Sequence, residues 1–287
     1  MKKIILYPNI SRDIDLEITH VVAKTLADAG REVVICPVYD DDTGIAISDP
    51  GYRVSELDIE YADAEMVITF GGDGTILRAA RAVADRSIPI LGINMGGKGF
   101  MAELEISDIH LIKNVVTGTY QTEQRMMLDS VVIRDGEIVS KDYALNDIVV
   151  RGYNKVINLK LYGDEQIISD FSGDGAVIAT PTGSTAYSLA AGGPIVEPSA
   201  HNIIVTPICA HILVAKPFVL VSDRRVTIKL GHERHNPAYI SADGSERVEL
   251  LSGDIVNISK SLMYTHLVHM SNKSFYSRVS DKLGERA

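Results

Sequence analysis

The chain of 287 residues is long enough for one large or two medium domains, at about 100–200 residues each. Its 46% hydrophobic residues exclude a mostly disordered chain, and its net charge of −10 argues against a surface for nucleic acid or anionic membrane. The apolar run at residues 4–6 is too short for a signal peptide, and no stretch reaches the ~20 apolar residues of a membrane span, so we expect a cytoplasmic protein.

The first third of the chain alternates short apolar runs with segments of helical spacing. Strands are expected at 3–7, 32–38, 65–70 and 88–93, and helices at 13–29 and 75–84. This alternation predicts a mainly parallel sheet with helices on its faces. Ligands of such sheets bind beyond the carboxyl ends of the strands. Cys36 and Cys209, both in apolar surroundings, are expected to be buried thiols.

From Arg125 onward the pattern changes to β-branched runs separated by turns. Strands are expected at 130–134, 144–151, 156–162, 176–180, 202–207, 217–221, 225–230, 238–242 and 254–260. This spacing predicts an antiparallel, sandwich-like all-β domain. We therefore expect an α/β domain at 1–124 and a β domain at 125–264. The final residues 265–287 have helical character at 275–284. We expect them to fold back on one of the two domains, with the first domain as the candidate.

Residues 71–75 read Gly-Gly-Asp-Gly-Thr, between a predicted strand and a predicted helix. Such a turn presents backbone N–H groups and a positive helix end to a phosphate. Asp73 cannot attract phosphate, so we interpret it as a base in phosphoryl transfer to a hydroxyl. A tight strand-to-helix turn without a ligand is the structural alternative, and Arg78 lies either at the phosphate or on a solvated helix face. The candidate donor-binding residues are Gly71, Gly72, Gly74, Thr75 and Arg78.

Two further segments carry groups that either contact a ligand or have only a structural role. Residues 92–98 imitate a P-loop, and the loop at 97–102 imitates a dinucleotide fingerprint, but neither matches. We expect this loop on the same sheet edge as residues 71–75, with Phe100 either stacked on a base or in the core. Asn146-Asp147 interrupts a strand-like run, so the pair either contacts a ligand or forms a turn or bulge.

Residues 180–188 read Thr-Pro-Thr-Gly-Ser-Thr-Ala-Tyr-Ser, the strongest signal after residues 71–75. Their hydroxyls can bind ribose and pyrophosphate oxygens, and Asp174 can accept hydrogen bonds from a ribose diol. A capped strand-to-helix turn explains the same residues, and the two interpretations are compatible. The Asp-Gly pairs at 135–136 and 243–244 are interpreted as hairpin turns.

Together these motifs resemble those of the NAD kinase family over nearly the whole chain. Residues 71–75 are similar to its first signature, which phosphofructokinases and diacylglycerol-type lipid kinases share, and residues 180–188 are similar to its most specific run. Weaker similarities are Gly99-Phe100, Arg125-Met126-Met127-Leu128 and Lys282-Leu283-Gly284. The family normally has Asn-Glu where this chain has Asn146-Asp147, and the shorter Asp147 reaches a ligand less easily.

The resemblance implies transfer of a phosphoryl group from ATP, or polyphosphate in some members, to the 2′-hydroxyl of the adenosine ribose of NAD. Asp73 is then the general base, Mg²⁺ accompanies the donor, and the metal ligands are not identified. The domain at 1–124 binds the donor, the domain at 125–264 binds NAD, and the chain forms a homodimer or homotetramer without nucleic-acid or membrane partners. The implied NAD-binding residues are Asp73, Gly74, Phe100, Asn146, Asp147, Lys155, Asp174, Thr185, Ala186, Tyr187 and Ser188.

Two rival functions remain open from the sequence. One is a lipid or sugar kinase of the same superfamily. The other is a dehydrogenase or a non-catalytic NAD(H)-binding regulator, which binds dinucleotide without forming NADP.

Overall fold

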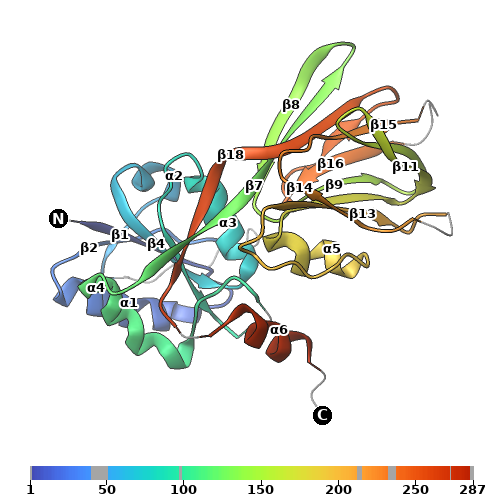
Figure 1. Ribbon diagram of the computed structural model, residues 1–287. Helices are drawn as coiled ribbons and strands as arrows, with labels where there is room; N and C mark the ends of the chain where they lie inside the picture. Colours follow the sequence, from blue (N-terminus) through green and yellow to red (C-terminus); the bar gives the residue numbers. More distant parts are fainter. Residues whose placement is uncertain are drawn as a thin grey trace. The chain divides into compact units, whose positions relative to one another are not determined.

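A computed structural model describes residues 2–39, 51–96, 99–211, 215–231, 237–271 and 273–284 (Figure 1). The chain divides into two units, Met1–Gln124 with Thr265–Ala287, and Arg125–Tyr264. Strands β7 (Gln121–Arg134) and β18 (Ile255–His269) each continue from one unit into the other. In the described ranges, no helix has the length and apolar character that a membrane crossing requires.

The first unit contains a parallel sheet with the strand order β18–β5–β4–β1–β2–β3 and β6 paired to β5. Its central strands are apolar on both faces, because helices cover both; Ile4, Ile5, Val67 and Ile68 are fully buried. The mainly parallel sheet predicted from the sequence is thus confirmed. The strands are β1 (Lys3–Pro8), β2 (Glu32–Ile35), β3 (Arg53–Val54), β4 (Ala64–Gly71), β5 (Ile90–Asn94) and β6 (Leu104–Glu105).

The helices of this unit flank the sheet, with α1 (Glu17–Asp28) and α4 (Lys113–Thr117) on one side and α2 (Leu57–Glu60) and α3 (Asp73–Val83) on the other (Figure 1). The helix predicted at 13–29 begins only at Glu17, because Asp15 and Leu16 have left-handed φ angles of 54° and 57°. The C-terminal helix α6 (Phe275–Leu283) also belongs to the first unit.

The second unit consists of two antiparallel sheets that share one core. One sheet has the order β14–β13–β12–β9–β16–β17, and the other contains β11–β10–β15–β18 with β7 and β8. Leu159 and Val256 from one sheet and Ile148 and Ile178 from the other lie in the same apolar cluster, which confirms the β-sandwich prediction. The strands are β8 (Glu137–Ala144), β9 (Asp147–Gly152), β10 (Ile157–Gly163), β11 (Gln166–Gly173), β12 (Gly175–Ala179), β13 (Asn202–Ile208), β14 (Phe218–Val221), β15 (Val226–Leu230), β16 (Ala238–Ala242) and β17 (Val248–Leu250).

Three local predictions differ from the structure. The strand predicted at 144–151 is divided, because β8 ends at Ala144 and β9 begins at Asp147. The strand predicted at 254–260 continues through His269. Cys36 is buried as expected, but the prediction for Cys209 is wrong: it lies exposed at the end of β13 with a φ of 46°.

Candidate active site

Asp73 lies where β4 passes into α3 in the first unit. β4 ends at Gly71 and α3 begins at Asp73, so only the extended Gly72 separates strand from helix. Asp73 is therefore in the first helical turn, where N–H groups lack intrahelical partners and the helix dipole is positive. The sheet thus places the carboxylate at the carboxyl end of a central strand, as the sequence predicted.

The glycines around Asp73 differ in the space that their neighbours leave for a side chain. A Cβ on Gly71 would overlap the buried side chain of Thr75, so packing explains this glycine. A Cβ on Gly72 or Gly74 would meet no atom within 4 Å among the described residues. The backbone at these two positions is therefore open to the close approach of a ligand.

The loop that begins at Gly99 closes on the Asp73 carboxylate. Oδ2 accepts the N–H of Phe100 at 2.9 Å, and Oδ1 accepts the N–H of Met101 at 3.1 Å. A Cβ on Gly99 would lie 2.6 Å from Asp73 Oδ1, so a glycine is needed for this approach. The loop and residues 71–75 do share one edge of the sheet. Residues 97 and 98 of the predicted loop lie outside the described residues.

Removal from water raises the pKa of Asp73 above its ordinary value, although the N–H groups of Phe100 and Met101 and the charge of Lys282 act in the opposite direction. Phe100 is half-buried, and Arg78 is exposed on α3. A carboxylate with a raised pKa accepts a proton from a hydroxyl more readily than an ordinary aspartate does. The environment of Asp73 is compatible with the proton acceptor that the sequence predicts.

In the second unit, Asn146 and Asp147 lie at the start of β9, and both are buried. The N–H groups of Leu145, Asn146 and Asp147 all donate to the carboxylate of Asp243, at 2.6, 2.8 and 3.0 Å. Asn146 Oδ1 is buried without a hydrogen-bond partner among the described residues. Because a buried acceptor of this kind is costly, it marks a position where a ligand can donate a hydrogen bond.

Asp243 is a residue whose importance the sequence did not reveal. It was interpreted only as the first residue of an Asp-Gly turn, and its φ of 49° followed by 71° at Gly244 confirms that turn. Asp135-Gly136 has the same conformation, with φ angles of 51° and 88°. Only the tertiary structure distinguishes the two, because Asp243 alone faces the amides before β9.

The carboxyl group of Asp147 has an unusual environment for an aspartate. Burial raises its pKa to about 7, and the negative charge of nearby Asp243 acts in the same direction. Both effects favour the protonated form of the Asp147 carboxyl.

The run at 180–188 directly follows β12 and contains the short turn Thr182–Thr185 and the start of the helix α5 (Tyr187–Ala190). The buried hydroxyls of Thr180 and Ser184 donate to the carbonyls of Leu145 and Pro181, each at 2.6 Å, and Ser188 Oγ lies 2.9 Å from Thr206 Oγ1. Structural hydrogen bonds thus account for these three hydroxyls. The half-buried members of the run, which keep surface for a ligand, are Thr185, Ala186 and Tyr187.

The remaining predicted residues lie at the other end of β9. β12 runs antiparallel to β9 with Ala179 opposite Asp147 and Gly175 opposite Arg151, so Asp174 is about 16 Å from the Asp147 end at ~3.3 Å per residue. Asp174 pairs with Arg151 at 3.8 Å. Lys155 is exposed in the turn after β9, at the same end as Asp174. The structure therefore joins Asn146, Asp147 and residues 180–185 but separates them from Asp174 and Lys155.

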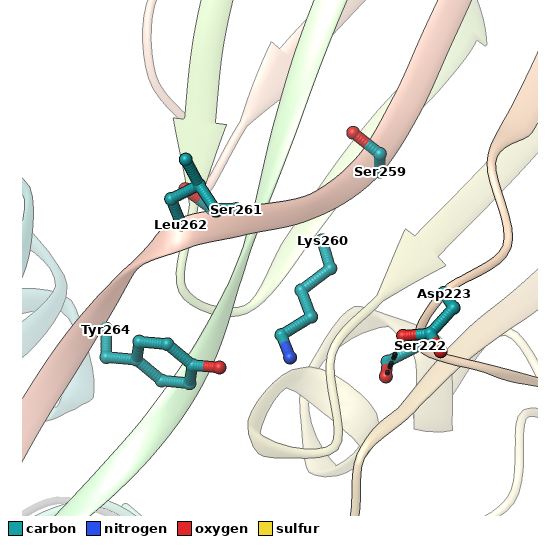
Figure 2. Close-up of a pocket in the computed structure, with 7 residues that line it drawn as sticks. All are labelled: Ser222, Asp223, Ser259, Lys260, Ser261, Leu262 and Tyr264. Carbon is teal, nitrogen blue, oxygen red and sulfur yellow. Dashed lines mark hydrogen bonds between the residues drawn. The ribbon is translucent and has the colours of Figure 1, made fainter.

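A hollow of about 370 Å³ in the second unit contains none of the predicted residues. Figure 2 shows the Lys260 amine between the Tyr264 hydroxyl and the side chains of Ser222 and Asp223. Lys260 Nζ lies 5.6 Å from the centre of the Tyr264 ring. This hollow is separate from both groups of candidate residues along β9. Across the described ranges, no three His, Cys, Asp or Glu side chains gather as a metal site.

Comparison with known families decides the class of protein. The ATP-NAD kinase N-terminal domain matches residues 15–120, and the ATP-NAD kinase C-terminal domain matches residues 145–270. The chain belongs to the NAD kinase family. The NAD kinase of Acetivibrio thermocellus is 35% identical over 100% of this chain and 98% of its own length. The NAD kinase of Caldanaerobacter subterraneus subsp. tengcongensis is 37% identical, with both chains covered completely.

Solved structures of the family have the same fold. An NAD kinase from Archaeoglobus fulgidus in complex with ATP has a TM-score of 0.74 at 25% identity, covering 99% of this chain and 98% of its own. Yeast NADH kinase complexed with NADH has a TM-score of 0.86 at 22% identity, covering 100% of this chain and 89% of its own. The NAD kinase fold therefore extends over both units.

Proposed function

We propose that this protein transfers the γ-phosphoryl group of ATP to the 2′-hydroxyl of the adenosine ribose of NAD, forming NADP and ADP. The observation that carries the proposal is Asp73, a carboxylate with raised pKa that two amides hold at the start of α3, next to open glycine backbone. Membership in the NAD kinase family supports the nature of the donor and acceptor.

In the proposed reaction, Asp73 accepts the proton of the 2′-hydroxyl as that oxygen attacks the γ-phosphorus. The new P–O bond forms while the bond between the γ-phosphorus and the bridging oxygen breaks, and ADP leaves with the electron pair. The N–H groups of residues 71–75 stabilise the charge on the donor phosphates, and Arg78 adds a cation nearby. The first unit is accordingly the donor-binding domain.

Mg²⁺ is proposed to enter with ATP. Mg²⁺ in such sites takes most of its ligands from phosphates and water and only one or two from carboxylates. The described residues fit this mode, since the open backbone at Gly72 and Gly74 leaves room for donor phosphates that carry the ion. When bound, Mg²⁺ neutralises charge on the donor phosphates.

The second unit is proposed to bind NAD. The unsatisfied Asn146 Oδ1 accepts a hydrogen bond from the nucleotide, and the shorter Asp147 acts directly or through water. Phe100 of the first unit stacks on a base. Thr185, Ala186 and Tyr187 supply the contact surface, with Ser188 supporting them from the interior. Asp174 and Lys155, at the other end of β9, contact another part of NAD or the NAD of a neighbouring copy in a homodimer or homotetramer.

The decisive test is formation of NADP by the purified protein from NAD, ATP and Mg²⁺. Parallel reactions replace ATP with polyphosphate and NAD with NADH, glucose or diacylglycerol in vesicles. We expect NADP from NAD and ATP. Binding of NAD without NADP formation would instead identify a non-catalytic regulator, and preferential phosphorylation of the sugar or lipid would identify another kinase of the superfamily.

A further inference from the structure

Glu103 connects the loop that holds Asp73 to the C-terminal segment of the chain. Its carboxylate is buried within the first unit, with the residue 4% exposed. Oε1 accepts the N–H groups of Met270 and Ser271 at 2.9 and 2.5 Å. Oε2 accepts from Arg278 Nη2 at 2.8 Å and lies 2.9 Å from His269 Nδ1. The C-terminal segment thus supplies four groups to one carboxylate.

Arg278 of α6 makes a second contact with the same loop. Its Nη1 donates to the carbonyl of Ala102 at 3.3 Å, while its side chain is only 15% exposed. Ala102 directly follows Met101, whose N–H binds Asp73. The guanidinium therefore binds both Ala102 and Glu103. These two residues directly follow Phe100 and Met101, whose N–H groups bind Asp73.

Lys282 lies one helical turn after Arg278, a spacing that places both side chains on one face of α6. Its positive charge lowers the pKa of Asp73, against the larger effect of burial. Lys282 Nζ also lies 3.4 Å from Glu105 Oε1. The same helix thus reaches Asp73 through hydrogen bonds and through charge.

We propose that α6 is part of the phosphoryl-transfer site, with Arg278 and Glu103 as positioning residues for the loop that holds Asp73. The inference rests on the proposed function in one respect, the role of Asp73 as the base. Loss of the Arg278–Glu103 contact loosens the loop and misplaces the base.

Lys273→Gln is the matched control for the test of positioning. Lys273 lies in the same C-terminal segment, but its side chain pairs with Asp108 at 2.9 Å rather than with Glu103, so its kcat should equal that of wild type.

The positioning effect is tested with Arg278→Lys and Glu103→Gln. Because a small misplacement of a catalytic group is costly, we expect kcat to fall by about tenfold or more, with each KM within about twofold of wild type. Arg278→Lys keeps the positive charge at this position, so the acidic limb of its pH profile for kcat/KM should not move. Unchanged kcat in both variants, or a loss that matches the fraction of unfolded protein, contradicts the positioning role.

Amide hydrogen exchange at Phe100 and Met101 keeps this inference separate from the proposed function. A wild-type protein that forms no NADP refutes the proposed reaction, yet faster exchange of these two amides in Arg278→Lys still supports the contact between α6 and the loop that holds Asp73. Normal NADP formation with unchanged amide exchange and unchanged kcat refutes the inference alone.

Discussion

Asp73 in the first unit and Asp147 in the second are both withdrawn from water, but the groups around them differ. Asp73 accepts two backbone N–H groups and experiences the positive charge of Lys282. Asp147 experiences the negative charge of Asp243, whose carboxylate takes the three N–H groups at the start of β9. Donors and a cation favour the ionised form of Asp73, whereas a like charge favours the protonated form of Asp147.

This difference teaches that burial alone does not assign a chemical role to an aspartate. An ionised carboxylate can accept a proton, which suits Asp73 as the proposed base. A carboxyl with a pKa of about 7 can also donate a hydrogen bond, which suits Asp147 to an acceptor on a nucleotide. The following predictions test the comparison, beginning with the largest expected effect.

Asp73→Asn removes the proposed base while keeping the size of the side chain. Since general-base catalysis contributes roughly 10²–10⁴-fold, we expect kcat for NADP formation to fall by that order while the affinity for NAD is largely preserved. Coupled assays measure the rate, and calorimetry measures NAD binding. Asp85→Asn, just beyond the end of α3, is the control and should retain normal turnover. Near-wild-type turnover of Asp73→Asn would contradict the assignment.

Asp243→Asn tests whether the three amides before β9 depend on a charged acceptor. An asparagine can keep only part of these hydrogen bonds, so we expect a loss of about 3 kcal/mol in the free energy of unfolding. Asp135→Asn is the matched control, because it occupies a turn of the same conformation. Its effect should stay within about 0.5 kcal/mol. Equal effects of the two variants in urea titrations would show that the Asp243 contacts do not stabilise the unit.

Asp147→Asn tests the raised pKa through the pH dependence of stability. The folded state holds a proton on Asp147 up to about pH 7, whereas the unfolded chain loses it near pH 4. Between these values the folded state binds more protons, so the Asp147 contribution makes wild type less stable as pH rises. We expect Asp147→Asn to lack this contribution, changing the stability difference from wild type by ~2 kcal/mol between pH 5 and 7. Parallel stability curves would exclude the raised pKa.

Gly99→Ala tests the contact between the loop and Asp73. The new Cβ would lie 2.6 Å from Oδ1, and the carboxylate can move aside at little cost to folding. We expect kcat to fall by about tenfold with a stability change under about 0.5 kcal/mol. Gly163→Ala, whose Cβ would meet only Leu220 at 3.9 Å, is the control. A stability loss in Gly99→Ala without a fall in kcat would show that the glycine serves packing only.

The sequence predicted the features that depend on neighbouring residues. The apolar run before Gly71 and the helical spacing after Thr75 placed Asp73 correctly, because strand, turn and helix are local structures. The alternation of β-branched runs and turns likewise predicted the sandwich. The boundary of α3 was missed by two residues, since Asp73 itself begins the helix.

The features that the sequence did not predict depend on contacts between distant residues. Asp243 and Asp135 stand in equivalent dipeptides, and only the packing of β16 beside β9 distinguishes them. Arg278 and Glu103 are 175 residues apart, so no spacing rule connects them. Cys209 has apolar neighbours, but the left-handed turn after β13 exposes it.

The passage of β7 and β18 between the units has a consequence for synthesis on the ribosome. The final strand segment and helix of the first unit are made only after the whole second unit. At a translation rate of about 5–20 residues per second, roughly ten to thirty seconds separate the synthesis of Glu103 from that of Arg278. A nascent chain therefore carries Asp73 long before its supporting contacts exist, and the loop that holds Asp73 gains its contacts to α6 only after Arg278 has been translated.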